Sequence, residues 1–361
     1  MKKGSLTIQF NWILVLLAGA VILLFFMGVI QYATQIADQK RNILIGTTLD
    51  SISNSIKSGD NLDKPIESIP NINVEYQCAS PGEGSNCKCS FIVGDRQFDI
   101  DDPSLIVFSP SRMKSPKVLV KSLEWDAPFR TANFLYFTST SVRYIFILDQ
   151  TSAGGWETDV LNSTHRDLKK EVYDASETNT IKSKNDDRVK FIFLNINPDS
   201  FDLSEFESMN DADVTAVAIA GDEFGGQLSY YQKKGSTLEP VNPSTSLSYR
   251  GFPFLLGGIF TDETSDSANF QCNQKRAYET LHYVANDYFQ RMNVVETIPD
   301  STDFCKTLYA TAKDHLGSLS DALATSYQSD LATMNDAIST SITILDDDNK
   351  EAIANSCVPL Y

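Results

Sequence analysis

A long hydrophobic run lies near the N-terminus, where residues 12–30 contain no charged side chain. A helix of that length rises about 28 Å, close to the thickness of the hydrocarbon core of a bilayer. Trp12 and Tyr32 stand at its two ends, where aromatic rings favour the membrane interface. A cleaved secretory signal would have a shorter apolar region and a small-residue cleavage motif. The pattern therefore predicts a transmembrane helix over 12–30, preceded by a cytoplasmic tail or leader over 1–11.

The helical pattern continues beyond this run. Residues 31–57 contain no proline, and aliphatic side chains recur there at helical spacing, at Ile36, Ile43, Ile45, Leu49, Ile52 and Ile56. Gly59 and Asp60, with prolines soon after them, are typical of a helix end. We expect a stalk helix over 31–60 that extends the transmembrane helix.

Patterns typical of strands dominate the middle of the chain. Short apolar runs between turn residues predict strands over 74–78, 89–93, 97–100, 104–108 and 117–123. Further along, apolar strands alternate with polar helical patterns, with strands over 142–148, 189–194, 214–220 and 227–232 and helices over 158–175 and 203–209. This alternation is typical of a parallel βαβ sheet, and continuous apolar strands indicate helices on both of its faces.

Helical periodicity dominates residues 266–361. Apolar residues recur every three or four positions over 268–296, and Pro299 interrupts the pattern. Beyond it the pattern forms either one very long helix or two helices that turn back near Ser326. Residues 341–345 are rich enough in β-branched side chains to form a strand instead.

These patterns together predict an α+β fold. The N-terminal transmembrane helix extends into the long stalk helix. A mixed β/α domain with a partly parallel sheet then occupies 61–265, and a helical C-terminal segment occupies 266–361.

The chain has an even number of cysteines, namely Cys78, Cys87, Cys89, Cys272, Cys305 and Cys357. An even number is typical of disulfides in an oxidising compartment. The CxC of Cys87 and Cys89 has no nearby histidine, which favours disulfides over a structural zinc site, and free buried thiols are the remaining alternative. A bond within 78–89 would pin a loop rich in turn residues. If the C-terminal helices turn back, Cys357 returns near Cys305, and Cys272 is left for Cys78, Cys87 or Cys89.

The formal net charge is −17 at pH 7, and the acidic excess lies beyond residue 40. Such a surface repels phosphate backbones, so we expect no nucleic-acid partner. The numbers of basic residues on the two sides of the hydrophobic run are nearly equal, so they do not determine how the chain is oriented in the membrane. The cysteines and the many acidic residues of the large domain decide its orientation. We expect a single-pass protein of the cell membrane, with the lipid bilayer as a partner and the large domain extracytoplasmic.

Polar side chains follow two of the predicted parallel strands. Asp149, Thr151 and Ser152 come after the first of these strands, and Asp222 comes after the third. Open α/β sheets bind ligands at the carboxyl ends of their strands, so these residues are the candidate ligand site. The alternative is that they are turn residues that cap strand ends. The sequence lacks the common nucleophile, phosphate-loop, dinucleotide and zinc-protease motifs, so we expect no enzyme, metal or cofactor.

The chain begins with Lys2-Lys3-Gly4, followed by Ser5-Leu6-Thr7-Ile8-Gln9-Phe10. This start resembles the N-terminus of archaeal type IV pilins, in which basic residues and a small residue precede a QxSxEF-like start of the hydrophobic helix. Gln9 replaces the glutamate that the family uses for subunit registration. The resemblance covers residues 1–30 and implies cleavage between Gly4 and Ser5, followed by packing of the helix into a filament core.

Two hypotheses for function follow. The first is a structural or assembly protein, a pilin-like surface subunit that associates with itself or with membrane proteins through its N-terminal helix. The second is an anchored ligand-binding or sensor module that uses the carboxyl edge of the parallel sheet.

Overall fold

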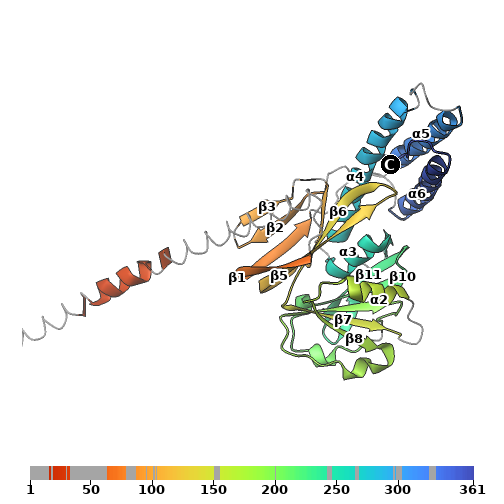
Figure 1. The fold of residues 1–361 in the computed structure, drawn as a ribbon. Helices are drawn as coiled ribbons and strands as arrows, with labels where there is room; N and C mark the ends of the chain where they lie inside the picture. Colours follow the sequence, from red (N-terminus) through yellow and green to blue (C-terminus); the bar gives the residue numbers. More distant parts are fainter. Residues whose placement is uncertain are drawn as a thin grey trace, which may run out of the picture. The chain divides into compact units, whose positions relative to one another are not determined.

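The computed structural model divides the chain into two compact units, Met1–Ile52 and Ser53–Tyr361 (Figure 1). It describes residues 16–17, 19–29, 31–32, 63–78, 87–94, 96–100, 102, 104–149, 155–199, 201–241, 246–264, 268–295, 297, 303–324 and 331–361.

The first unit contains a helix whose described core is residues 19–29. Within the described residues no helix combines the length and the apolar character needed to cross a membrane. The run 19–29 rises about 16 Å, roughly half of the hydrocarbon thickness, and no long stalk helix is described beyond it. The prediction of a transmembrane helix that extends into a long stalk is therefore wrong. An apolar run in the sequence shows that a segment is hydrophobic, but it does not determine how long the helix is. Residues 1–15 and 33–62, which include Gly4, Ser5 and most of the predicted stalk, lie outside the described residues.

The second unit contains a six-stranded sheet, here called sheet A, with the strand order β3-β2-β1-β5-β6-β4. Its strands are β1 (Asp63–Cys78), β2 (Cys89–Val93), β3 (Arg96–Asp99), β4 (Leu105–Phe108), β5 (Arg112–Asp126) and β6 (Arg130–Ser139). In β1 the apolar residues Val74, Tyr76 and Cys78 are buried, and the polar residues between them are exposed. This period of two places one face of the strand against the core. All neighbours are antiparallel except β4, which pairs with β6 in parallel.

A seven-stranded sheet, sheet B, follows with the order β12-β11-β10-β9-β7-β8, and β13 pairs with β11. Its strands are β7 (Val142–Leu148), β8 (Lys169–Asp174), β9 (Arg188–Leu194), β10 (Val214–Gly221), β11 (Gly225–Lys234), β12 (Thr237–Pro240) and β13 (Leu247–Arg250). The strands β8, β7, β9 and β10 are parallel neighbours. The alternating pattern predicts a parallel arrangement for β7, β9 and β10, but not the strand β8. Every residue of β7 and β9 is buried, which is typical of strands covered on both faces.

The two faces of sheet B are covered differently. One face packs against the helices α2 (Gly155–Ser163) and α3 (Phe252–Phe260) through residues such as Phe146 and Val160. The other face, with Ile145 and Phe191, packs against loops and short 3₁₀ turns that supply Ile181, Leu203 and Phe206. The expectation of helices on both faces is therefore wrong for the second face. The predicted helix over 158–175 is also wrong in its second half, where the chain forms the edge strand β8.

Helix α3 connects the two sheets. Its Phe254 ring contacts Trp125 and Phe134 of sheet A, while Phe260 lies against Tyr136 and Tyr144, one from each sheet. The helix is apolar all round because it is buried on all sides. A Cβ atom at its Gly257 would lie 2.7 Å from the Phe108 ring, so this close approach requires glycine. The two sheets and α3 thus share one hydrophobic core.

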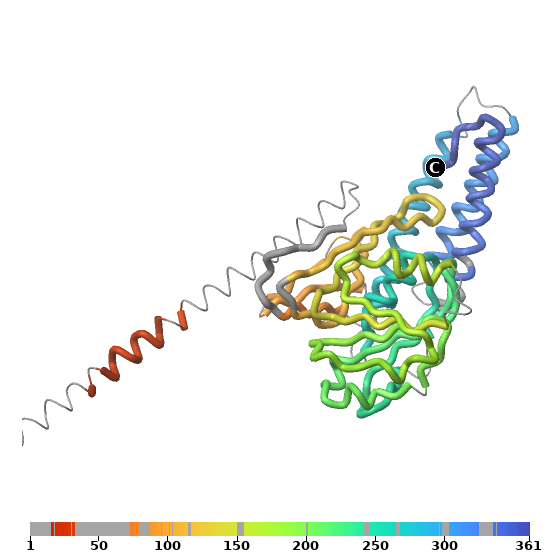
Figure 2. Tube along the Cα trace, turned by 60° about the horizontal axis from the view of Figure 1, so that its bottom comes forward, coloured from red at the N-terminus to blue at the C-terminus, as the bar shows by residue number. Residues whose placement is uncertain are grey.

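The C-terminal segment forms three helices that run side by side (Figure 2). They are α4 (Asn269–Val295), α5 (Asp303–Ala324) and α6 (Leu331–Ala354). Residues 341–345 are helical, so the strand alternative for them is wrong. The chain turns back between α5 and α6, because a disulfide joins Cys305 at the start of α5 to Cys357 just after α6.

The expected disulfides are confirmed. Cys78 is bonded to Cys89 and closes the loop between β1 and β2. Cys87 is bonded to Cys272 and ties that loop to α4. With the Cys305–Cys357 bond, no cysteine is free. The Cys305–Cys357 bond agrees with the pairing expected from two C-terminal helices that turn back, and Cys272 is bonded to one of the three cysteines that the sequence leaves open for it.

Candidate functional site

The carboxyl edge of sheet B is organised by hydrogen bonds within its own turns. Asp222 follows β10, and its Oδ1 accepts hydrogen bonds from the backbone N–H groups of Phe224 and Gly225, at 2.9 and 3.1 Å. The Tyr249 hydroxyl donates to the Asp222 carbonyl oxygen at 2.7 Å. The Asp222 carboxylate therefore closes the turn between β10 and β11, in keeping with the alternative reading of this residue.

Asn195 reinforces the same edge after β9. Its backbone has a φ of 55°, a conformation that asparagine tolerates better than most residues. Its side chain donates to the Gly221 carbonyl at 3.1 Å and accepts from the Gly221 N–H at 3.0 Å. Among the predicted ligand residues, Thr151 and Ser152 lie outside the described residues, and Asp149 is exposed at the end of β7. A ligand site formed by Asp149, Thr151 and Ser152 stays a prediction.

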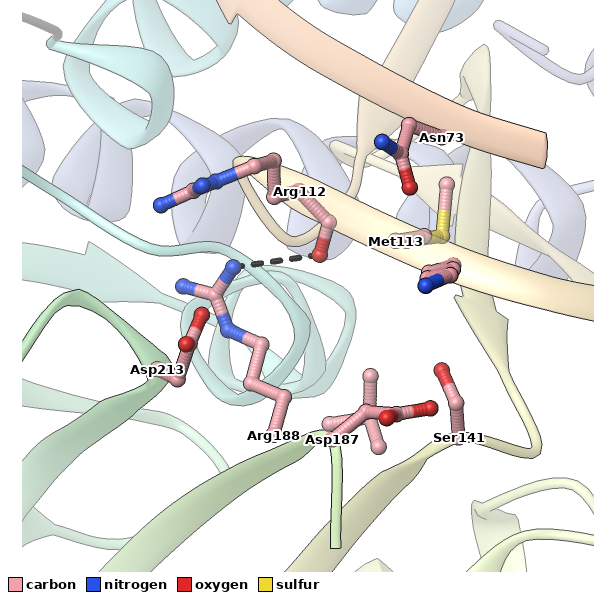
Figure 3. Close-up of a pocket in the computed structure, with 9 residues that line it drawn as sticks. Asn73, Arg112, Met113, Ser141, Asp187, Arg188 and Asp213 are labelled. Carbon is pink, nitrogen blue, oxygen red and sulfur yellow. Dashed lines mark hydrogen bonds between the residues drawn. The ribbon is translucent and has the colours of Figure 1, made fainter. Parts of the chain in front are cut away.

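A cavity of about 270 Å³ lies at the opposite, amino edge of sheet B (Figure 3). The starts of β7, β9 and β10 form one side, and β1 and β5 of sheet A form the other. The lining residues are Asn73, Arg112, Met113, Lys114, Ser141, Val142, Asp187, Arg188 and Asp213. This volume lies just below the usual range of about 300–1,000 Å³ for small-molecule sites, so the cavity suits a small ligand.

Both signs of charge meet at this cavity. Arg112 and Lys114 are exposed on β5, and Asp187 and Asp213 come directly before β9 and β10. The side chains of Arg112, Lys114 and Asp187 form no hydrogen bond or ion pair with another residue that the structure describes. Asp213 accepts a hydrogen bond from Asn210 at 3.2 Å. The rim therefore offers two unpaired cations and an unpaired carboxylate to a ligand.

Arg188 forms the buried floor of the cavity. Its Nη1 donates to the Arg112 carbonyl oxygen at 3.1 Å, the bond drawn in Figure 3. Its Nη2 donates to the Ser111 hydroxyl at 3.2 Å and lies 2.9 Å from Asp262 Oδ2. These contacts fix the guanidinium, so the floor is held in place before any ligand binds.

Asp262 is the centre of a buried polar cluster below this floor. Its Oδ1 accepts from Lys190 Nζ at 3.1 Å and from the Thr215 hydroxyl at 2.9 Å. Burial alone would raise the pKa of Asp262, but Arg188 and Lys190 lower it to about 2. Burial lowers the pKa of Lys190, although Asp262 opposes that shift. The cluster is thus a buried carboxylate held charged by two cations.

The next residue, Glu263, is buried as well, but it forms no ion pair with any cation in the described part of the chain. Its Oε1 accepts from the N–H groups of Phe270 and Gln271, at 2.6 and 3.3 Å, at the start of α4. Burial raises the pKa of Glu263 to about 8, although these backbone hydrogen bonds oppose the shift. Two adjacent acids therefore have opposite shifts, because only one of them has cations beside it.

The charged lining residues of the cavity can recognise a charged ligand. Its described lining residues include no histidine or cysteine, the side chains that most often act as a base or a nucleophile near neutral pH. The sulfurs of Cys78, Cys89 and Cys272 lie close together elsewhere in this unit, but all three belong to disulfides, and zinc requires thiolates.

The cavity lies at the amino edge of sheet B, whereas the candidate residues predicted from the sequence follow the carboxyl ends of its strands. A usable signal was present, since Asp187-Arg188 and Asp213 place charges directly before apolar strands, and Arg112 and Lys114 alternate along β5. Nothing in the sequence, however, indicates that β5 lies beside the amino ends of the sheet B strands.

Comparisons of the chain with models of protein families, with curated proteins and with solved structures give no match.

Proposed function

We propose that the chain is a subunit of an extracytoplasmic assembly, in which copies associate through the N-terminal apolar helix. The observation that carries this proposal is that every residue of the helix over 19–29 is exposed, although most of its side chains are apolar. A helix that is apolar all round normally lies in an apolar environment. A large exposed apolar surface of this kind marks an interaction site.

The occupant we propose for this surface is the same helix from other copies. The resemblance of residues 2–10 to archaeal type IV pilins supports this choice, because helices of that family pack together in a filament core. The acidic globular unit would then remain on the outside, where its charge keeps it solvated. Three disulfides support an oxidising location for that unit.

Cross-linking through single added cysteines tests this proposal. Leu24 in the helix and Phe224 in the β10–β11 turn are almost equally exposed, at 67% and 68%. We expect Leu24→Cys to form intermolecular disulfides in a mild oxidant, while Phe224→Cys stays monomeric on a non-reducing gel. Equal cross-linking of the two variants, or none in Leu24→Cys, would contradict the proposal.

A second candidate function is the binding of a small zwitterion at the amino edge of sheet B. The unpaired Arg112 and Lys114 would receive its carboxylate, and Asp187 and Asp213 would receive its ammonium group. Calorimetric titration with glycylglycine tests this function, with the uncharged N-acetylglycine amide as the control ligand. We expect heat from glycylglycine alone and at least a tenfold weaker affinity in Arg112→Gln. Equal heats from the two ligands would exclude this charge recognition.

A further inference from the structure

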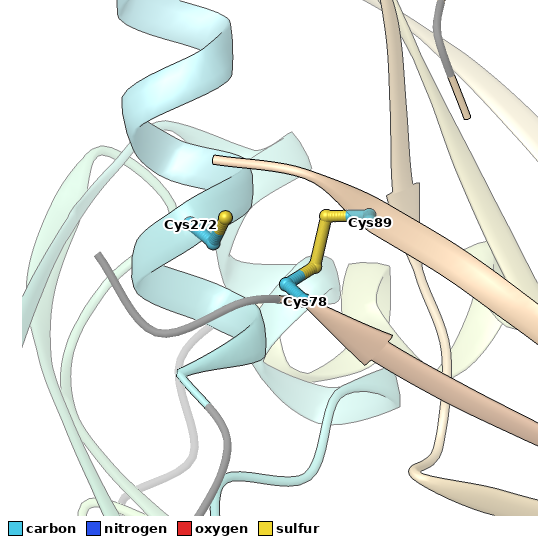
Figure 4. Close-up of side chains that lie close together, drawn as sticks. All are labelled: Cys78, Cys89 and Cys272. Atoms are coloured by element: carbon cyan, nitrogen blue, oxygen red, sulfur yellow. A yellow bond between two sulfur atoms is a disulfide. The ribbon is translucent and has the colours of Figure 1, made fainter. Parts of the chain in front are cut away.

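Four of the six cysteines lie together where β1, β2 and α4 meet. The sulfur atoms of Cys78, Cys89 and Cys272 all lie within 4.8 Å of one another. Figure 4 shows Cys272 on the side of α4 that faces the Cys78–Cys89 bond. Cys272 is itself bonded to Cys87. One disulfide therefore lies beside a sulfur of the other.

The four cysteines differ in how exposed they are to solvent. Cys78, Cys89 and Cys272 are buried, with exposures of 3%, 1% and 0%, while Cys87 is half-buried. A thiol from solvent therefore reaches Cys87 Sγ before the other three. Attack on Cys87 Sγ releases Cys272 as the leaving thiolate, inside the cluster and next to the second disulfide.

We propose that this cluster is a thiol–disulfide exchange site. It accepts electrons from an external dithiol at Cys87, and a second exchange then breaks the Cys78–Cys89 bond and releases Cys78 as the free thiol. This proposal does not depend on the proposed assembly. In the first step, one thiolate of the dithiol bonds to Cys87 Sγ and breaks the Cys87–Cys272 bond. The second thiol of the dithiol then displaces Cys87, and the dithiol leaves as its disulfide.

The second step is an exchange without net oxidation or reduction. The Cys272 thiolate attacks Cys89 Sγ, so that the Cys89–Cys272 bond forms and the Cys78–Cys89 bond breaks. Cys78 leaves as a thiolate. Two electrons from the dithiol have then reduced one disulfide, and its two protons end on Cys87 and Cys78.

The neighbours of the sulfurs favour Cys78 as the leaving group. The Tyr76 hydroxyl lies 3.2 Å from Cys78 Sγ, and burial raises the pKa of Tyr76, so the hydroxyl keeps its proton. At rest the same hydroxyl donates to the Val107 carbonyl at 2.6 Å, and it can turn to a thiolate when one forms. The carbonyl oxygen of the Asn273 side chain lies 3.7 Å from Cys89 Sγ and disfavours negative charge there.

The exchange also changes which elements are joined. Before it, Cys78–Cys89 links β1 to β2, and Cys87–Cys272 links the loop before β2 to α4. After it, a bond between Cys89 and Cys272 would join β2 to α4 directly. The covalent link between the adjacent strands β1 and β2 would be lost, while the link between sheet A and the helices would remain.

Limited reduction of the full chain tests the proposal. The protein is treated with one equivalent of dithiothreitol and quenched with acid, and free thiols are labelled with N-ethylmaleimide before peptide mapping. We expect label on Cys78 and Cys87, together with a cross-linked peptide that contains Cys89 and Cys272. Label on Cys87 and Cys272 with Cys78–Cys89 intact would overturn the proposal, as would first reduction of Cys305–Cys357.

Two variants sharpen the result. Cys87→Ala leaves Cys272 as a thiol without any reductant, so we expect a Cys89–Cys272 bond and a free Cys78 in the purified protein. A free Cys272 beside an intact Cys78–Cys89 bond in that variant would refute exchange. Tyr76→Phe should slow the appearance of label on Cys78 several-fold. The matched control is Tyr136→Phe, since the Tyr136 hydroxyl is buried but donates to Pro253, away from the sulfurs, and it should label like the wild type.

Discussion

Arg188 and Asp262 form an ion pair of 2.9 Å in the interior, with side-chain exposures of 6% and 1%. The pair joins the start of β9 to the segment between α3 and α4. Asp262 Oδ2 also accepts from the Ser111 backbone N–H at 3.1 Å, which extends the connection to sheet A. This carboxylate therefore connects both sheets and lies directly below the amino-edge cavity.

Asp262→Asn is expected to destabilise the protein strongly. The substitution leaves Arg188 and Lys190 buried without a counter-charge, and removing one partner of a buried ion pair costs about 3–5 kcal/mol. Urea unfolding followed by circular dichroism measures the loss. The control is Glu239→Gln, which breaks the exposed pair with Lys234 and should cost below about 1 kcal/mol. Equal losses in the two variants would contradict the role of the buried pair.

The raised pKa of Glu263 should make the stability of the protein depend on pH. Its pKa is about 8 in the folded protein against an ordinary value of 4.5, because the buried site disfavours the charge. Between these values the folded state holds a proton that the unfolded state has lost, so stability falls as the pH rises towards 8. The slope for one proton is about 1.4 kcal/mol per pH unit. Asp262, with a pKa of about 2, stays ionised over this range and does not contribute.

The comparison of wild type with Glu263→Gln isolates this effect. Glutamine carries no charge at any pH, and other titrating groups contribute equally to both proteins. We expect the unfolding free energy of the wild type, minus that of the variant, to decrease steadily from pH 5 to pH 8. A difference that stays constant over this range would show that Glu263 titrates normally.

The strands of sheet B show how far the sequence predicts the fold. The runs that form β7, β9 and β10 are predicted as strands because they are mostly apolar, although Arg143, Lys190 and Thr215 lie within them. Mostly apolar runs are typical of strands covered on both faces. The sequence predicts a helix where the edge strand β8 forms, because an edge strand is partly exposed and Lys169–Asp174 carries no clear alternation. The 3₁₀ turn η2 (Ser204–Phe206) is likewise shorter than the helix predicted there.

The candidate site was less accessible to sequence reasoning. The Cys305–Cys357 pairing follows from local geometry, because two helices that turn back place these residues near each other. The sequence leaves the partner of Cys272 open among three cysteines. The amino-edge cavity depends instead on tertiary packing, which places Arg112 of sheet A opposite Asp187 and Asp213 of sheet B. No local pattern records that arrangement. The apolar run at the N-terminus is a case in which the local pattern is clear but insufficient, since its hydrophobicity did not determine the length of the helix.

Two substitutions at Asp222 test whether its hydrogen bonds stabilise the turn between β10 and β11. Asp222→Ala removes the oxygen that accepts from Phe224 and Gly225, and we expect a loss of about 1 kcal/mol. Asp222→Asn keeps an acceptor oxygen at the same position and should cost a few tenths of that amount. Thermal unfolding of the two variants checks the difference. Equal destabilisation by alanine and asparagine would show that the charge matters more than the hydrogen bonds.

Sedimentation velocity measures whether copies associate through the apolar N-terminal helix. Leu23 in this helix is 66% exposed, and Leu23→Glu places a charge on the proposed contact, whereas Phe224→Glu places one on an exposed turn outside it. We predict that the wild type and Phe224→Glu sediment as large assemblies, while Leu23→Glu sediments as a 40.1 kDa monomer with unchanged circular dichroism. A wild type that is monomeric under the same conditions, or a Leu23→Glu variant that assembles like the wild type, would contradict association through this helix.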